Sequence, residues 1–94
     1  KTLTMPNTKV LKFSAAWCQH CHKIDPIFKE LENKFTTFNF VNIDIDSEEG
    51  QKLIAKYGIR NIPLVIIEND DKTVRIAGSK TKIEYLNALN EFLE

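Results

Sequence analysis

Cysteine is scarce in this chain, because only Cys18 and Cys21 occur among its 94 residues. Both belong to one short motif, so no cysteine remains for a structural disulfide elsewhere. Small secreted proteins normally carry several such cross-links. The scarcity therefore favours a reducing compartment, and we expect a cytoplasmic protein.

The chain also has no net charge at neutral pH. Thirteen Lys and Arg residues balance thirteen Asp and Glu residues. No overall field therefore favours nucleic acid or an anionic membrane as a partner.

Long apolar runs are also missing. No stretch approaches the roughly 20 residues of a transmembrane helix, and residues 1–8 lack the apolar segment of a signal peptide. The hydrophobic fraction of 43% is that of an ordinary globular protein. We expect one domain over residues 1–94, with residues 1–8 as a loose lead-in, working as a monomer.

The chain does contain a Trp-Cys-Gln-His-Cys motif at residues 17–21. It follows the apolar run 10–13 and precedes a segment with helical periodicity. A Cys-x-x-Cys pair near such a strand-to-helix junction indicates redox chemistry. The first turn of a helix has unsatisfied N–H groups and a partial positive charge, which stabilise a thiolate at Cys18. Since the thiolate is the reactive form, we predict that Cys18 attacks and that Cys21, one turn on, is the resolving thiol.

Apolar spacing and turn residues predict the element order β-α-β-α-β-β-α. The expected strands cover residues 9–14, 38–44, 64–67 and 72–77, and the expected helices cover residues 18–35, 48–57 and a segment that follows residue 81. The strand at 64–67 is apolar throughout, as expected for a strand buried on both faces. We therefore predict an α/β fold with a four-stranded mixed sheet and helices on both of its faces.

The helices carry start and stop signals. Ser47 can cap the second helix, and Gly58 suits the left-handed residue that ends it. Thr81 with Glu84 is a capping-box pattern for the last helix. The expected apolar faces are Ile24, Phe28, Leu31 and Phe35 in the first helix and Ile83, Leu86, Leu89 and Leu93 in the last.

This element order, the Trp-Cys-x-x-Cys motif, Pro26 in the helix that follows it, and Ile62-Pro63 about forty residues later resemble the thioredoxin family. The likeness runs from about residue 9 to the carboxyl end. It implies a thioredoxin fold and a thiol-disulfide oxidoreductase that exchanges disulfides with protein substrates. It also implies that no bound cofactor is needed and that a flavin-dependent thioredoxin reductase supplies electrons if the flow is reductive.

Three departures from the family pattern are visible. Residues 1–8 are too short for the strand and helix with which thioredoxins usually begin. The family commonly has Gly-Pro between its cysteines, where this chain has Gln19 and His20. The family's buried strand acid and the lysine often paired with it correspond to Lys12 and Phe40 here.

Gln19, His20 and Lys12 are therefore the candidate redox-tuning residues. A cationic His20 would stabilise the Cys18 thiolate and make the disulfide a stronger oxidant, whereas a solvated neutral His20 would not. Thioredoxin-fold proteins that oxidise or isomerise disulfides resemble this chain in having His there. We predict a potential of roughly −230 to −180 mV, above that of thioredoxin. Lys12 either stabilises thiolate charge or buries its stem and extends its ammonium to solvent.

The resemblance also implies a cis peptide bond at Ile62–Pro63 that faces the cysteines. It would leave the Ile62 backbone free to pair with an extended substrate segment. Trp17, Ile62, Pro63 and the backbone around Gly78 would then form a small apolar rim for a protein substrate. The alternatives are a trans proline that starts an edge strand and a Trp17 that lies in the core.

Two alternatives place a metal at the motif. Cys-x-x-Cys-His over residues 18–22 matches c-type haem attachment with His22 as an axial ligand, but Met5 is the only methionine and the strand–helix context argues against haem. A structural zinc site needs four ligands, and the two cysteines with one histidine are too few. No metal site is therefore predicted.

Two further alternatives keep the fold. Glutaredoxin, a glutathione-dependent reductase, typically has Cys-Pro-Tyr-Cys and a Gly-Gly turn, whereas Gly78 is followed by Ser79 here. The other is a thioredoxin-fold interaction module that clamps a protein partner through the same rim in either redox state.

Overall fold

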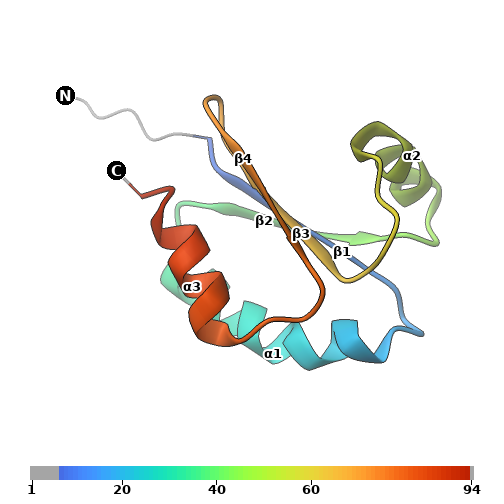
Figure 1. The fold of residues 1–94 in the computed structure, drawn as a ribbon, viewed down its shortest axis with the longest axis horizontal. Helices are drawn as coiled ribbons and strands as arrows, with labels where there is room; N and C mark the ends of the chain where they lie inside the picture. Colours follow the sequence, from blue (N-terminus) through green and yellow to red (C-terminus); the bar gives the residue numbers. More distant parts are fainter. Residues whose placement is uncertain (1–6, 94) are drawn as a thin grey trace.

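The computed structural model describes residues 7–93, so most of the predicted lead-in over residues 1–8 lies outside the described residues. The elements follow the predicted order β-α-β-α-β-β-α (Figure 1). The strands are β1 (Lys9–Ser14), β2 (Asn39–Asp44), β3 (Leu64–Glu68) and β4 (Thr73–Ala77), and the helices are α1 (Gln19–Lys34), α2 (Glu48–Tyr57) and α3 (Lys82–Asn90). The predicted strands are confirmed.

The four strands form one mixed sheet in the order β2-β1-β3-β4. β1 and β2 are parallel neighbours joined through α1, whereas β3 is antiparallel to both β1 and β4. In this register Lys12, near the middle of β1, lies between Asn42 and Val65. The mixed sheet and the β3–β4 hairpin are therefore as predicted.

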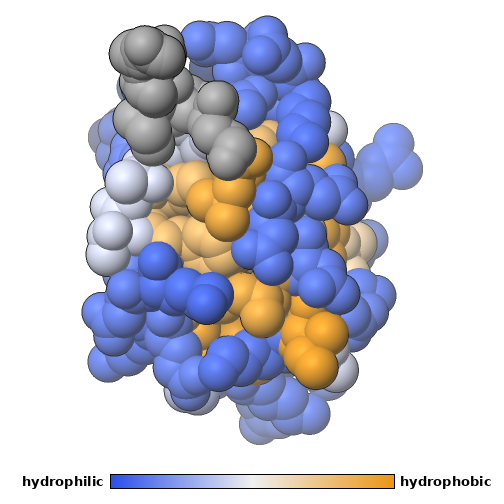
Figure 2. Space-filling model, turned by 90° about the vertical axis from the view of Figure 1, so that its left-hand side faces the viewer, coloured by the Kyte–Doolittle hydropathy of each residue, from blue (hydrophilic) through white to orange (hydrophobic). Residues whose placement is uncertain are grey.

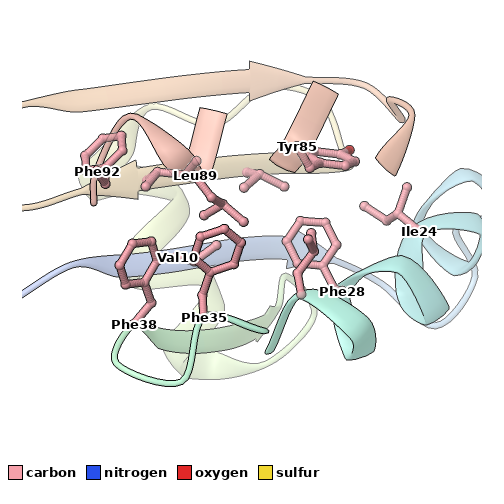
Figure 3. Packing of buried hydrophobic residues seen from close by; sticks show 11 residues of the cluster. Val10, Ile24, Phe28, Phe35, Phe38, Tyr85, Leu89 and Phe92 are labelled. Atoms are coloured by element: carbon pink, nitrogen blue, oxygen red, sulfur yellow. The ribbon is translucent and has the colours of Figure 1, made fainter. Parts of the chain in front are cut away.

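Helices cover both faces of the sheet, because α1 and α3 lie on one side and α2 on the other (Figure 1). The larger apolar cluster fills the space between the sheet, α1 and α3, and Figure 3 shows its aromatic rings facing one another. Phe28 of α1 meets Tyr85 of α3 edge to face, with ring centroids 4.9 Å apart. All four residues predicted for the apolar face of α1 are buried in this cluster. On the opposite face, Tyr57 of α2 packs edge to face on Phe13 of β1.

The predicted apolar face of α3 is wrong at two positions. Ile83 and Leu93 are exposed, whereas Tyr85, Leu89 and Phe92 are buried. Residues 85, 89 and 92 are also spaced as one helical face, so the sequence offers two candidate stripes that share Leu89. Contact between the Tyr85 ring and α1 selects the aromatic stripe.

The capping box predicted at the start of α3 is confirmed. The Thr81 hydroxyl accepts a hydrogen bond from the Glu84 N–H at 3.2 Å, and the Glu84 carboxylate accepts one from the Thr81 N–H at 3.0 Å. We expect Thr81→Ala to lower the free energy of unfolding by about 1 kcal/mol, because a helix-terminal N–H loses its acceptor. Thermal unfolding should show a fall in Tm of about 4–8 °C. Thr81→Ser keeps the hydroxyl and is the control; an unchanged Tm in Thr81→Ala would contradict the expectation.

The two ends of the sheet differ in what they carry. In Figure 1 the junction between β1 and α1, with the cysteine motif, lies at the right, whereas the start of β1 and the β3–β4 turn lie at the left. Figure 2 looks onto that left-hand end, where apolar side chains are visible between hydrophilic ones. Within residues 7–93, none of the helices combines the length and apolar character that crossing a membrane requires.

Candidate active site

The junction between β1 and α1 holds the two cysteines in one turn. After Ser14 the chain bends, and the N–H of Cys18 donates to the carbonyl of Ala15 at 3.1 Å. Cys18 is the N-cap residue of α1, and its Sγ accepts a hydrogen bond from the N–H of Cys21 at 3.2 Å. The two sulfurs form a disulfide. The start of the helix thus directs an N–H group at the Cys18 sulfur, which is the environment that stabilises a thiolate.

The two cysteines differ in exposure. Cys18 retains 7% of its surface and Cys21 only 1%. Both pack with Ala15 in a small cluster against which Ile45 and Ile62 lie. Both cysteines are therefore buried, but Cys18 is the more accessible of the two, as the attacking residue must be.

The loop before β3 lies against the cysteines. Ile62 packs on the cysteine cluster, and the Ile62–Pro63 peptide bond is cis. The carbonyl of Pro63 accepts a hydrogen bond from the N–H of Gly78 at 2.9 Å, which brings the turn after β4 to the same place. Within residues 7–93 the backbone of Ile62 takes no part in a backbone hydrogen bond. The structure thus brings Ile62 to the disulfide and Gly78 to Pro63.

Tyr85 holds the turn that contains Gly78. Its hydroxyl donates to the Gly78 carbonyl at 3.2 Å and accepts from the Lys80 N–H at 3.2 Å. We expect Tyr85→Phe to cost about 1 kcal/mol of unfolding free energy, because the Gly78 carbonyl and the Lys80 N–H each lose a partner at a part-buried position. Urea denaturation measures the loss. Tyr57→Phe is the control, since its hydroxyl bonds the side chain of Glu68, and an equal loss in both variants would speak against this assignment.

Trp17 lies on the surface beside the motif. It is 66% exposed, which excludes the alternative of a core position. Its indole N–H donates to the carboxylate of Asp46, in the loop between β2 and α2, at 2.8 Å. The polar edge of the ring is therefore bonded to the protein while most of the side chain faces solvent.

Lys12 makes a contact that the sequence did not predict. Its side chain is only 6% exposed, so the predicted extension of the ammonium to solvent is wrong. The Nζ donates to Oδ1 of Asp25 on α1 at 2.5 Å and lies 5.2 Å from the centroid of the Phe28 ring. A buried ammonium requires a partner, because an unpaired charge away from water is costly. Phe40, which stands where the family often has a lysine, packs edge to face on the same Phe28 ring. A direct effect of Lys12 on the Cys18 thiolate stays a prediction.

Asp25 is a residue of this region that the sequence interpretation missed. It lies one helical turn after Cys21. The only sequence signal for the Lys12–Asp25 pair was an acid in the predicted helix and a lysine in the middle of the preceding apolar strand. Burial raises the pKa of Asp25, but the hydrogen bonds from Lys12 and His22 outweigh burial and hold that pKa below 3.8. Asp25 therefore contributes stability that is present above pH 3.8 and is lost as the pH falls through its lowered pKa.

The three remaining polar residues of the first turn differ in their contacts. Gln19 and His20 are exposed, and their effect on the redox potential stays a prediction. His22, which the haem alternative used as an axial ligand, directs both ring nitrogens at acceptors of the protein itself. In the part of the chain that the structure describes, no group of three or more His, Cys, Asp and Glu side chains is placed to hold a metal ion.

Comparison with known proteins gives one family. The family model for thioredoxin matches residues 2–91. Thioredoxin-2 of Dictyostelium discoideum is 46% identical over 54 residues, which are 57% of this chain and 59% of that protein. Thioredoxin H5 of Oryza sativa subsp. japonica is 35% identical over 86 residues, which are 85% of this chain and 62% of that protein. The chain thus spans about three fifths of the length of these two curated relatives.

Solved structures agree with the sequence comparison. Thioredoxin NaTrxh from Nicotiana alata superposes with a TM-score of 0.83 at 28% identity, and the match covers 94% of this chain and 75% of that one. A thioredoxin mutant from Halobacterium salinarum superposes with a TM-score of 0.82 at 25% identity, covering 94% and 76%. The predicted thioredoxin fold is confirmed, and the glutaredoxin-like alternative is not favoured.

Proposed function

The chain belongs to the thioredoxin family, and from this premise we propose that it exchanges disulfides with protein substrates through Cys18 and Cys21. The observation that carries the proposal is the disulfide at the N-terminus of α1, with Cys18 the more accessible residue of the pair. A pair of cysteines that can close and reopen at a helix N-terminus is suited to thiol–disulfide exchange.

The exchange proceeds in two displacement steps. In the reduced protein the Cys18 thiolate attacks one sulfur of a substrate disulfide, which forms a mixed disulfide and releases the other substrate sulfur as a thiolate that takes up a proton. Cys21, as a thiolate, then attacks the Cys18 sulfur and releases the second substrate thiol. Two electrons pass from the dithiol to the substrate, and the protein is left with the Cys18–Cys21 disulfide. The same steps in reverse oxidise a substrate dithiol.

The surface around the disulfide suits an extended peptide. The Ile62 backbone lies beside the cysteines and takes no part in a backbone hydrogen bond within residues 7–93, so it is available to a substrate strand. Trp17 offers an exposed apolar ring beside the motif. Pro63 is itself buried, and its carbonyl holds the half-buried turn of Gly78 at the rim. We assign substrate binding to these four residues.

The partner and the compartment follow from the same proposal. Electrons for the reductive direction come from a flavin-dependent thioredoxin reductase, and the protein works as a monomer in a compartment that keeps thiols reduced, such as the cytoplasm. Gln19 and His20 between the cysteines set the potential of the disulfide, with His20 favouring the reduced form.

Two measurements test the proposal. Reduction of insulin by dithiothreitol should accelerate in the presence of the protein, and precipitation of the insulin B chain reports it. Redox equilibration with glutathione should give a potential of about −230 to −180 mV. Insulin that stays soluble would overturn the proposed activity, and a potential at or below the thioredoxin value would overturn the tuning by Gln19 and His20.

A further inference from the structure

His22 makes two hydrogen bonds that need two donated protons. Its Nε2 lies 2.7 Å from the carbonyl oxygen of Ala16, and its Nδ1 lies 3.3 Å from Oδ2 of Asp25. A carbonyl and an ionised carboxylate can only accept, and a neutral imidazole has one N–H. Only the imidazolium, with an N–H on each nitrogen, satisfies both contacts at once.

The contacts of His22 continue into the sheet. The other carboxylate oxygen of Asp25 accepts from the Nζ of Lys12, which is anchored in β1. A line of alternating charge therefore runs from Lys12 through Asp25 to His22 and ends on Ala16, two residues before Cys18. The line joins the loop that carries the attacking sulfur to the middle of the sheet.

We propose that His22 is a positioning residue for the thiol–disulfide exchange: its imidazolium ties the loop of Ala16 and Cys18 to the Asp25–Lys12 pair. Loss of one ring proton removes one of the two ties and the positive charge of the imidazolium. The reactivity of Cys18, measured as a function of pH, should consequently change at the pH where His22 loses its proton. This inference rests on the proposed function, because it concerns the same sulfur.

The charges around His22 agree with this role. The titratable and charged groups that face its ring are Asp25 on its own helix and Lys12 on β1. The backbone N–H of His22 donates to the Cys18 carbonyl as part of α1. The hydrogen bond to the Ala16 carbonyl and then that to Asp25 raise the pKa of His22 above 6.5, against a smaller lowering by burial and by Lys12. The stability that His22 contributes is fully present below pH 6.5 and is lost as the pH rises through its raised pKa.

The proposal predicts that the titration of His22 differs between the reduced and the oxidised protein. If His22 and the Cys18 thiolate interact, each must raise the population of the charged form of the other. The midpoint of the His22 titration should therefore be higher in the reduced protein, where Cys18 can ionise, than in the disulfide form. A histidine that only fills space at this position would titrate alike in both states.

The experiment follows the ring protons of His22 by NMR across pH, in the oxidised and the reduced protein. We expect a midpoint above pH 6.5 that rises on reduction and falls in Asp25→Asn. His20→Gln is the matched control, because His20 is an exposed histidine of the same helical turn and takes no part in the contacts of His22 with Ala16 and Asp25. The rise of the His22 midpoint on reduction should persist in this variant. Equal midpoints in the two redox states would overturn the proposal.

The second readout is the rate of Cys18 alkylation by iodoacetamide as a function of pH. The unaltered protein should show the ionisation of the thiol and an additional step at the His22 midpoint. His22→Gln keeps a hydrogen-bonding side chain that does not titrate, so the additional step should disappear, whereas His20→Gln should keep it. An unchanged profile in His22→Gln would also overturn the proposal. Failure to reduce insulin, with the step present, would instead refute the proposed function and leave only the coupling between His22 and the Cys18 thiol.

Discussion

Cys18→Ser is expected to reduce the turnover of protein disulfides to the background rate of dithiothreitol alone. A serine hydroxyl does not ionise near neutral pH and cannot enter a disulfide, so no mixed disulfide forms. The helix N-terminus that stabilises the thiolate then has no nucleophile to act on. The measurement is the insulin reduction assay, in which the loss should be complete although the fold is unchanged by circular dichroism.

Cys21→Ser is the matched control for this experiment. It retains the Cys18 thiolate, so the first attack still occurs, but the buried resolving sulfur is missing and the mixed disulfide accumulates. Non-reducing electrophoresis with a disulfide substrate should therefore show a covalent complex in Cys21→Ser and none in Cys18→Ser. The opposite pattern would reverse the roles of the two cysteines.

Asp25→Asn is expected to destabilise the protein by about 2–3 kcal/mol, because it leaves the buried ammonium of Lys12 without a charged partner. The figure is reduced from that of a fully buried pair, since the side chain of Asp25 is 44% exposed while that of Lys12 is 6% exposed. Lys12→Met removes the buried charge itself and keeps the packing on Phe28, so its cost should be about 1 kcal/mol or less. Urea denaturation of both variants measures the difference.

The double variant Lys12→Met with Asp25→Asn completes a double-mutant cycle for this ion pair. With no buried charge left, it should be more stable than Asp25→Asn alone, and the coupling between the two sites should be favourable. Were Asp25→Asn no more costly than Lys12→Met, the ammonium would be reaching water, as the extended alternative for Lys12 required. The thermal midpoint at pH 7 provides an independent readout of the same ranking.

Local signals in the sequence determined the elements and the place of the chemistry. The Ser47 and Thr81 caps, the left-handed Gly58 and the apolar stripe of α1 each depend on residues within one or two helical turns, and all of them are as predicted. The same holds for Cys18 and Cys21, whose pairing needs only the geometry of a helix start. Contacts of this kind can be predicted because the backbone conformation of a few neighbouring residues fixes them.

Only the tertiary structure decided the contacts between elements. The sequence allowed two apolar stripes on α3, and the approach of Tyr85 to Phe28 selected one. The Lys12–Asp25 pair and its extension through His22 exist because α1 packs over the middle of β1, so that residues 13 positions apart in the chain meet. Such pairs depend on how a strand and a helix are placed against each other, and neither residue alone carries that information.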